Sequence, residues 1–439
     1  MTTLTLCEWV HNLRYDDIPP QVIEVAIRSI YNWLGCAIGG SQHEAVSIAI
    51  SALDEFSGPR IASILGRHEK FDVSNAALIN GISSHVFDFD DTHLKTVIHP
   101  AGPVVSCLMA YAQSRHMTGR EFLLAAVCGI EVECRIGNAV FPDHYDRGWH
   151  ITGSTGVFGA AVAIGKAKNL SILQLQNAIG VAASQSVGLR EQFGTMTKSF
   201  HPGRAAQNGL LAAVLAEKGF TASTNVLEAK RGWAYVLSTK FDLNKVTENL
   251  GQIWETELNT FKPFACGIVL HPVIDGCARL RREGIKADDI RWVDCKVHPL
   301  VLELTGKTRP KLGLEGKFSY THACASALLE GKAGEQQFSD DFVKSDTVVN
   351  LREKVRAEID ENINSDSARI IITLNDGSKK EMFVEHAIGS LGVPLSKNQV
   401  VEKFMDLVLP IIGEQRGKQI TETCFQLDKI DNAASIALL

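Results

Sequence analysis

Long segments with apolar residues at helical spacing fill the first two-thirds of the chain. One starts at Pro19–Pro20 and keeps this spacing as far as Gly39–Gly40, where two glycines end it. Another follows a capping box formed by Thr118 and Glu121. The run 153–167 is rich in Gly and Ala, and such small side chains let neighbouring helix backbones approach closely. These segments predict a tight, mostly buried helical bundle.

The pattern changes after the first 266 residues. An alternating run at 291–304 predicts a strand, and Asp376–Gly377 lies between two strand-like runs as the tight turn of a hairpin. Helical spacing then returns. The fold class that we predict is mainly α, with a large all-helical domain plus a smaller α+β lid domain inserted before the C-terminal helices. The predicted domains are a helical domain at 1–266, a lid at 267–395, and C-terminal helices at 396–439 that pack back on the helical domain.

Length, charge and cysteine spacing narrow the class of protein. A chain of 439 residues is too long for one simple core, so two domains are expected. A net charge of -6 argues against the cationic surface of a nucleic-acid-binding protein. The start has no export signal, and no run reaches the roughly 18 apolar residues that a membrane span needs. Ten scattered cysteines without a C-x-x-C pair predict buried, reduced thiols. We expect a cytoplasmic protein that binds neither nucleic acid nor a membrane.

The densest polar cluster is HVFDFDDTHLKTVIHPAGP, residues 85–103. Because its flanks are apolar, we expect an active-site loop in which carboxylates orient and tune histidines. A metal site is an alternative, but D-F-D-D-T-H matches neither the EF-hand spacing nor H-E-x-x-H, and we predict no metal. A capped, solvated loop is the other alternative. The polar residues of the cluster are His85, Asp88, Asp90, Asp91, Thr92, His93, Lys95 and His99.

Three further residues are candidates on position alone. His150 precedes the glycine-rich run, where a helix N-terminus favours an anion, although a lone histidine is more often structural. Tyr145 is a candidate second proton carrier, or else a buried anchor. His271 opens the second domain, where it either closes over a substrate or serves as a linker residue.

A basic cluster follows at Lys198, His201 and Arg204, which lie three positions apart. On a helix this spacing stacks three basic groups along one edge, which suits a ligand with several carboxylates. Desolvation beside other cations lowers the pKa of a lysine, so Lys198 is a candidate base. The alternative is a solvated basic edge.

Several common catalytic motifs are missing from the sequence. It contains no G-x-x-x-x-G-K-[ST] phosphate loop and no G-x-S-x-G elbow, and its G-x-x-G-x-x-G run has no preceding strand. Acyl, phosphoryl and hydride transfer therefore lose support. Proton transfer without a cofactor gains support instead. The expected ligand is a small-molecule polycarboxylate.

Taken in order, the motifs resemble the MmgE/PrpD family over nearly the whole chain. They are D-F-D-D-T-H with H-P, G-W-H, G-T-x-T-K-x-x-H-x-G, a later A-C with H, and E-G-K-F-S. The resemblance implies a helical domain with a smaller lid, a homodimer, and a positively lined site that works without metal or organic cofactor. By position it implies roles for Asp88, Thr92, His99, His150, Lys198 and His271. With Tyr145 added, we predict Lys198, His99, His150, Asp88, Tyr145 and His271 as catalytic, and Thr92, His93, His201 and Arg204 as substrate-binding.

The family includes 2-methylcitrate dehydratase, cis-aconitate decarboxylase and iminodisuccinate epimerase activities, which all make or quench carbanion character beside a carboxylate. Two departures from the decarboxylase pattern stand out. The loop between Thr92 and His99 is one residue longer, and His322 replaces a tyrosine, with Tyr320 nearby. We therefore expect epimerisation of an iminodisuccinate-type amino-dicarboxylate, with Tyr145 and Lys198 as the acid–base pair. A lyase of the dehydratase or decarboxylase type and a non-catalytic helical scaffold are the alternatives.

Overall fold

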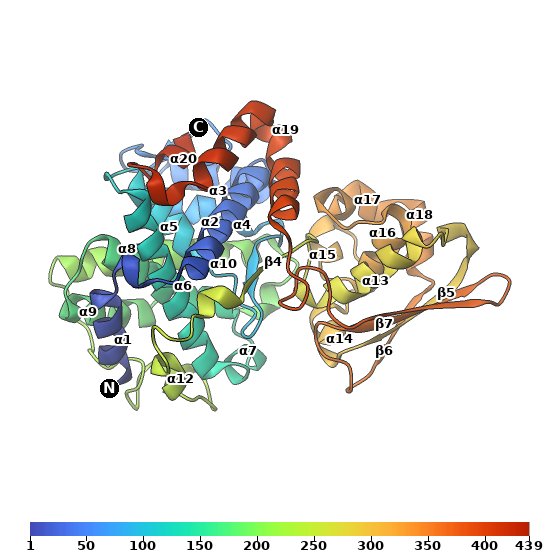
Figure 1. Cartoon of the computed structure of the whole chain (residues 1–439), viewed down its shortest axis with the longest axis horizontal. Coiled ribbons are helices and arrows are strands. Elements are labelled where there is room, and N and C mark those ends of the chain that lie inside the picture. Colours follow the sequence, from blue (N-terminus) through green and yellow to red (C-terminus); the bar gives the residue numbers. More distant parts are fainter. Residues whose placement is uncertain (439) are drawn as a thin grey trace.

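The computed structural model describes residues 1–438, so Leu439, the last residue of the predicted segment 396–439, lies outside it. A larger body of packed helices and a smaller body with the long strands lie side by side (Figure 1). The chain enters the smaller body after β4 and returns to the larger one through α19. This architecture confirms the predicted fold class, mainly α with an α+β lid inserted before the C-terminal helices. The residue numbers at which we divide the domains stay a prediction.

The larger body is built almost entirely from helices. Two short antiparallel strand pairs accompany them, β1 (Ala62–Ser63) with β2 (Lys70–Phe71) and β3 (Asp91–His93) with β4 (Asn259–Phe261). The helices are α1 (Thr2–Asn12), α2 (Pro20–Gly40), α3 (Glu44–Asp54), α4 (Val73–His85), α5 (Ala101–Ala112), α6 (Gly119–Val140), α7 (Asp143–Asp146), α8 (Ile151–Ala167), α9 (Ile172–Ala183), α10 (Met196–Glu217), α11 (Trp233–Leu237) and α12 (Asn244–Thr247).

Small residues allow the central helices to pack at short range. A Cβ added at Gly81 of α4 would overlap the Cα of Gly203 in α10, and one added at Gly209 would lie 2.7 Å from the carbonyl of Val157 in α8. Any larger side chain would separate the helices. The expected tight bundle is therefore present, and it brings α4, α8 and α10 together at the end where they carry polar residues.

The smaller body has one mixed sheet of four strands in the order β6-β5-β7-β8, with β5 and β6 parallel and the other neighbours antiparallel. Its strands are β5 (Ile290–Val297), β6 (Val355–Ile359), β7 (Ala368–Leu374) and β8 (Lys379–Val384). Its helices are α13 (His271–Arg282), α14 (Pro299–Thr305), α15 (Gly313–Gly316), α16 (Tyr320–Glu330), α17 (Asp340–Lys344) and α18 (Asp346–Arg352), and α13 packs against both β7 and α16.

Two strand predictions in this body have different outcomes. The hairpin is confirmed, since β7 and β8 flank the turn and Gly377 has a φ of +85°. The second half of the predicted run 291–304 is wrong. β5 ends at Val297 because the His298 side chain caps α14 and Pro299 occupies its first turn, and Pro strongly favours that position.

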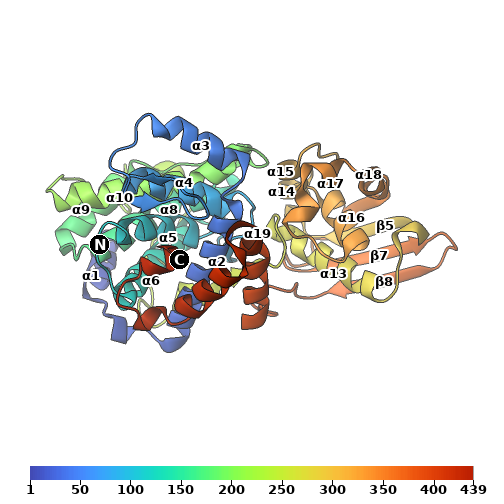
Figure 2. The same cartoon turned by 90° about the horizontal axis from the view of Figure 1, so that it is seen from above.

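The long helix α19 (Lys397–Cys424) carries the chain back onto the larger body and is followed by the short α20 (Ser435–Leu438). Seen from above, α19 lies beside α2 at the junction of the two bodies (Figure 2). The ring of Phe404 stacks on Tyr31 with centroids 4.2 Å apart, above Gly35. The non-helical backbone of Gly413 bends the helix.

All ten cysteines are buried and free, as their spacing predicts. Over residues 1–438, the structure contains no helix that combines the length and the apolar character required to cross a bilayer.

Candidate active site

A cavity of about 40 Å³ lies where the two bodies meet. Side chains from both bodies form its walls, so the lid is part of the site. Its apolar wall includes Val97, Phe193, Ile268, Val269, Leu304 and Phe318, and its polar residues are Asp88, Tyr145, Lys198, Lys262, Thr305 and two histidines, His99 and His150.

Asp88 lies between two buried ammonium groups. Lys198 Nζ is 3.0 Å and Lys262 Nζ 2.6 Å from the same oxygen, Oδ1, while Oδ2 has no hydrogen-bond partner within residues 1–438. Burial alone would raise the pKa of Asp88, but the two ammonium groups outweigh burial and hold that pKa well below its usual range. Asp88 is therefore an anion with one oxygen still free to accept a hydrogen bond.

The two lysines respond differently to this shared partner. Burial lowers the pKa of Lys198, and Asp88 only partly offsets it. For Lys262, burial also disfavours the charged form, but the closer carboxylate wins and raises its pKa. Lys262 is thus a permanent cation, whereas Lys198 is the lysine that can give up a proton.

Three buried lysines fix the backbone around Asp88. The carbonyls of residues 87–89 accept hydrogen bonds from Lys317 at 2.8 Å, Lys262 at 3.1 Å and Lys403 at 2.6 Å, in that order. We call these three side chains the lysine clamp. Its members come from the lid, the segment between the bodies, and α19. Since Asp88 itself has a φ of +50°, which non-glycine residues rarely adopt, the clamp holds an unfavourable backbone in place.

His85 connects Lys198 to a second carboxylate. Its Nε2 lies 3.0 Å from Lys198 Nζ and its Nδ1 2.5 Å from Asp90 Oδ2. Burial lowers the pKa of His85, so the neutral ring accepts at Nε2 and donates from Nδ1. Asp90, His85 and Lys198 form a hydrogen-bonded chain that ends at the cavity.

His99 is held by its own loop. Its Nδ1 lies 2.7 Å from the carbonyl of Asp91, and because a carbonyl only accepts, Nδ1 must carry the proton. Burial lowers the pKa of His99 to about 3. The neutral ring therefore keeps Nε2 as its one basic atom.

His150 and His201 contact each other through like atoms. Their Nδ1 atoms are 2.8 Å apart. His150 is the N-cap residue just before α8, and His201 lies inside α10. Burial lowers the pKa of both rings, that of His201 to about 4. His150 lines the cavity and His201 supports it from behind.

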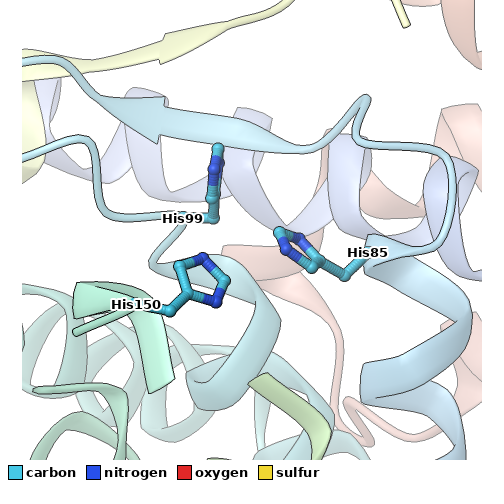
Figure 3. Close-up of side chains that lie close together, drawn as sticks. All are labelled: His85, His99 and His150. Carbon is cyan, nitrogen blue, oxygen red and sulfur yellow. The ribbon is translucent and has the colours of Figure 1, made fainter. Parts of the chain in front are cut away.

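Three histidines converge closely enough to consider a metal (Figure 3). His85, His99 and His150 each offer one ring nitrogen, and these atoms lie within 4.8 Å of one another. Both nitrogens of His85 are already engaged, however, and one of them accepts from the Lys198 ammonium. A cation bound to the three histidines would have to displace that ammonium, so this set fits proton transfer better than metal binding. A second set with ligand spacing is Asp88, Asp90 and His99, in which Asp88 Oδ2 and Asp90 Oδ1 have no hydrogen-bond partner among the described residues.

Tyr145 and His271 lie at a second, larger cavity that adjoins the first. Tyr145 is buried and borders both cavities, and Arg190 packs 4.1 Å from its ring. His271 borders only the larger cavity, and neither of its ring nitrogens has a partner among the described residues. The structure brings Tyr145 to the site and leaves His271 beside it.

The other predicted binding residues are dispersed. Thr92 Oγ1 lies 3.2 Å from His99 Nδ1, so Thr92 orients that ring without lining the cavity. His93 bonds to Thr96 and Glu255 and faces away from the cavity. The role in substrate binding that we predict for His93 has no support from this geometry.

Arg204 is exposed and bonds to Gln207. The expected basic edge does not form, because steps of three on a helix with 3.6 residues per turn place residues six apart about 120° around the axis. Lys198 and His201 thus turn inward while Arg204 faces out.

Lys262, Lys317 and Lys403 are functional residues that the sequence motifs did not predict. A lysine inside an apolar run was the available signal, since Lys262 lies between Phe261 and Pro263. His322, which favoured an epimerase in the sequence, lies away from the site. This ring is buried in the lid, where Nε2 donates to the carbonyl of Gln337 at 2.8 Å, and it does not line the cavity.

Two domains of one known family match this chain. The MmgE/PrpD N-terminal domain matches residues 4–245, and the MmgE/PrpD C-terminal domain matches residues 264–427. Cis-aconitate decarboxylase from Aspergillus terreus is 28% identical over 98% of this chain and 93% of its own length. The Homo sapiens enzyme of that name is 26% identical over 90% of this chain and 85% of its own length. These relatives are decarboxylases, so they favour the lyase alternative over the epimerase expectation.

Proposed function

The chain belongs to the MmgE/PrpD family, and on that premise we propose that it is a lyase that decarboxylates a tricarboxylate of the cis-aconitate type. The observation that carries this proposal is the pairing of two buried ammonium groups, on Lys198 and Lys262, with uncharged histidines in one cavity. Such a site attracts carboxylates and still holds a proton to deliver.

Binding begins with charge. Lys262 stays protonated and offers a fixed positive charge to a carboxylate, and the N-terminus of α8, which directly follows His150, favours a second one. A bound polyanion also raises the pKa of the neutral rings of His99 and His150, because nearby negative charge stabilises the imidazolium. Substrate binding is therefore accompanied by proton uptake.

The chemical step needs one bond to break and one proton to arrive. The bond between carbon and the departing carboxylate breaks, and its electron pair forms a new double bond to the adjacent carbon. The electron pair of the original double bond moves to the far carbon, where a retained carboxylate stabilises it. Carbon dioxide leaves, and the far carbon takes a proton. Apolar side chains such as Val269, Leu304 and Phe193 surround the site, and loss of water around a carboxylate favours its departure.

Lys198 is the proton donor in this proposal. Its lowered pKa makes the ammonium a stronger acid than an exposed lysine. His85 and Asp90 lie behind it in a hydrogen-bonded chain that stabilises the proton-donating form. Neutral His99 also lines the cavity and offers its basic Nε2 to the substrate.

Epimerisation has less support. It needs a base on one face and an acid on the other, with the roles exchangeable. Burial raises the pKa of Tyr145, which favours the protonated phenol and opposes its use as a base. The His322 difference that favoured an epimerase lies in a side chain that does not line the cavity.

The test is proton NMR of the purified protein with cis-aconitate in deuterated water. The expected result is loss of carbon dioxide with one deuterium in the product. Lys198→Met should lower kcat by about 10²- to 10⁴-fold, whereas Arg204→Met, an exposed cation on the same helix, should not. Interconversion of iminodisuccinate stereoisomers, with cis-aconitate untouched, would overturn the proposal, as would loss of water from citrate or 2-methylcitrate alone.

A further inference from the structure

The larger cavity beside the active site continues directly from it. Its volume is about 610 Å³, against about 40 Å³ for the first cavity. The two share a wall to which both bodies contribute. The shared residues are Val97, Tyr145, Ile268, Val269 and Leu304.

Beyond the shared wall, the larger cavity is mainly apolar. Leu94, Phe141 and Pro142 line it from the larger body, and Pro272, Leu300 and Leu391 from the segments of the lid. Exposure of such side chains to water is unfavourable unless an apolar group covers them.

Two of its charged neighbours are paired, and the third, Asp146, is an exposed carboxylate that would repel a polyanion. Lys95 pairs with Glu255 at 3.5 Å, and Asp366 pairs with His386 at 2.7 Å. A passage that guided polyanions would be expected to carry free cations. The two cavities therefore differ in chemistry. The buried ammonium groups lie in the first cavity, and the larger cavity offers mainly apolar surface.

We propose that the larger cavity binds an apolar substituent, an alkyl chain, carried by the same substrate whose carboxylates occupy the first cavity. This inference rests on the proposed decarboxylase function. The natural substrate class is then an alkyl-substituted tricarboxylate, with its chain running along the junction of the two bodies.

The border residue Tyr145 fits this division. Its ring is buried at the shared wall, and Arg190 fixes it by packing on the ring and donating to its carbonyl at 2.9 Å. Arg190 also pairs with Glu303 of the lid at 2.7 Å. A closed lid thus keeps the aromatic wall in place between the polar and the apolar ends of the substrate.

The test is a series of cis-aconitates substituted with chains from methyl to hexyl. Each buried methylene should raise kcat/KM about fourfold, because its transfer from water is worth about 0.8 kcal/mol. If unsubstituted cis-aconitate is decarboxylated but kcat/KM stays level or falls with chain length, the inference is overturned and the proposed function stands.

If no member of the series is decarboxylated, binding separates the two ideas. Calorimetry with saturated alkyl tricarboxylates should then still give an affinity that rises about fourfold per methylene. Such a rise supports the apolar site and overturns only the decarboxylase proposal, whereas affinity that is independent of chain length overturns both.

A substitution in the cavity provides a second check. Leu300→Asp places a charge in the apolar wall and should lower the ratio of kcat/KM for the hexyl and unsubstituted substrates at least tenfold. Leu173→Asp, at an exposed leucine on α9, is the matched control and should leave that ratio unchanged. The ratio needs no correction for partial unfolding, and an unchanged ratio in Leu300→Asp contradicts the inference.

Discussion

The Nδ1 atoms of His150 and His201 lie 2.8 Å apart in a buried contact, so one proton joins the two rings. Two neutral imidazoles can meet in this way only if one Nδ1 donates and the other accepts. The tautomer of His150, which faces the cavity, is therefore coupled to that of His201, which does not. His201 acts as a positioning residue in this arrangement.

Removal of the His201 ring should change how His150 holds its proton. His201→Phe should lower kcat about tenfold to a hundredfold, which corresponds to one hydrogen bond to a buried ring. The acid limb of the kcat profile should also move, while His201→Gln, which can still bond, should recover part of the loss. A profile of unchanged shape in His201→Phe, with only the amount of folded protein reduced, would point to a purely structural role.

Asp88 should be critical for stability as well as for activity. Asp88→Asn leaves the ammonium groups of Lys198 and Lys262 without an anionic partner and should cost about 3–5 kcal/mol in the free energy of unfolding. Urea denaturation measures this. The double variant Asp88→Asn/Lys262→Met should recover part of the loss, because it removes one unpaired charge, and strict additivity of the two single effects would refute the shared pairing.

The pH dependence of stability should reveal a buried neutral histidine outside the cavity. Burial lowers the pKa of His144 to about 4, and its Nε2 lies 2.7 Å from Ser154 Oγ. Between the unfolded pKa of about 6.5 and pH 4, the unfolded chain binds a proton that the folded chain does not, so stability falls as pH falls. This one group accounts for about 3 kcal/mol across that interval.

His144→Gln should therefore be less stable than the parent at pH 7 but should lose less stability on acidification. The measurement is urea unfolding at several pH values from 7 to 4. Because other titrating groups are shared, the difference between the two proteins isolates His144. Parallel curves over the whole interval would contradict the assigned pKa.

Helix packing gives a prediction that does not involve charge. Gly81→Ala would bring a methyl group into the backbone of Gly203, which cannot move without separating α4 from α10. The expected cost is about 1–3 kcal/mol or more, measured by thermal unfolding. Gly417→Ala is the control, because its methyl group meets the flexible end of Met405 at 3.0 Å, and there the better helix propensity of alanine should offset the contact.

Local signals predicted the helical body well. The capping box of Thr118 and Glu121 forms at the start of α6, and α2 runs from Pro20 to Gly40 as the sequence indicates. The strand prediction failed from His298 onward, because alternation alone does not distinguish a strand from a short helix that begins with proline. The fold class was predictable because each segment carries the hydrophobic spacing and the end signals of its own helix or strand.

The site was predictable only in part, for a physical reason. Asp88, His99, His150 and Lys198 lie in dense polar motifs and do meet at the cavity. Lys262 pairs with a residue 174 positions away, and no local spacing announces such a contact. Arg204 does not join Lys198 and His201 at the site, because residues equally spaced along a helix do not all point in the same direction around its axis.

The lysine clamp has a consequence for the life of the polypeptide. Lys403 lies 314 residues after Phe89, the carbonyl of which it binds. A growing chain on the ribosome therefore completes most of its helical body long before the last of the three donors exists. The loop that carries Asp88 gains its full support only when synthesis is nearly finished, because a chain that ends before Lys403 lacks one of the three hydrogen bonds to that loop.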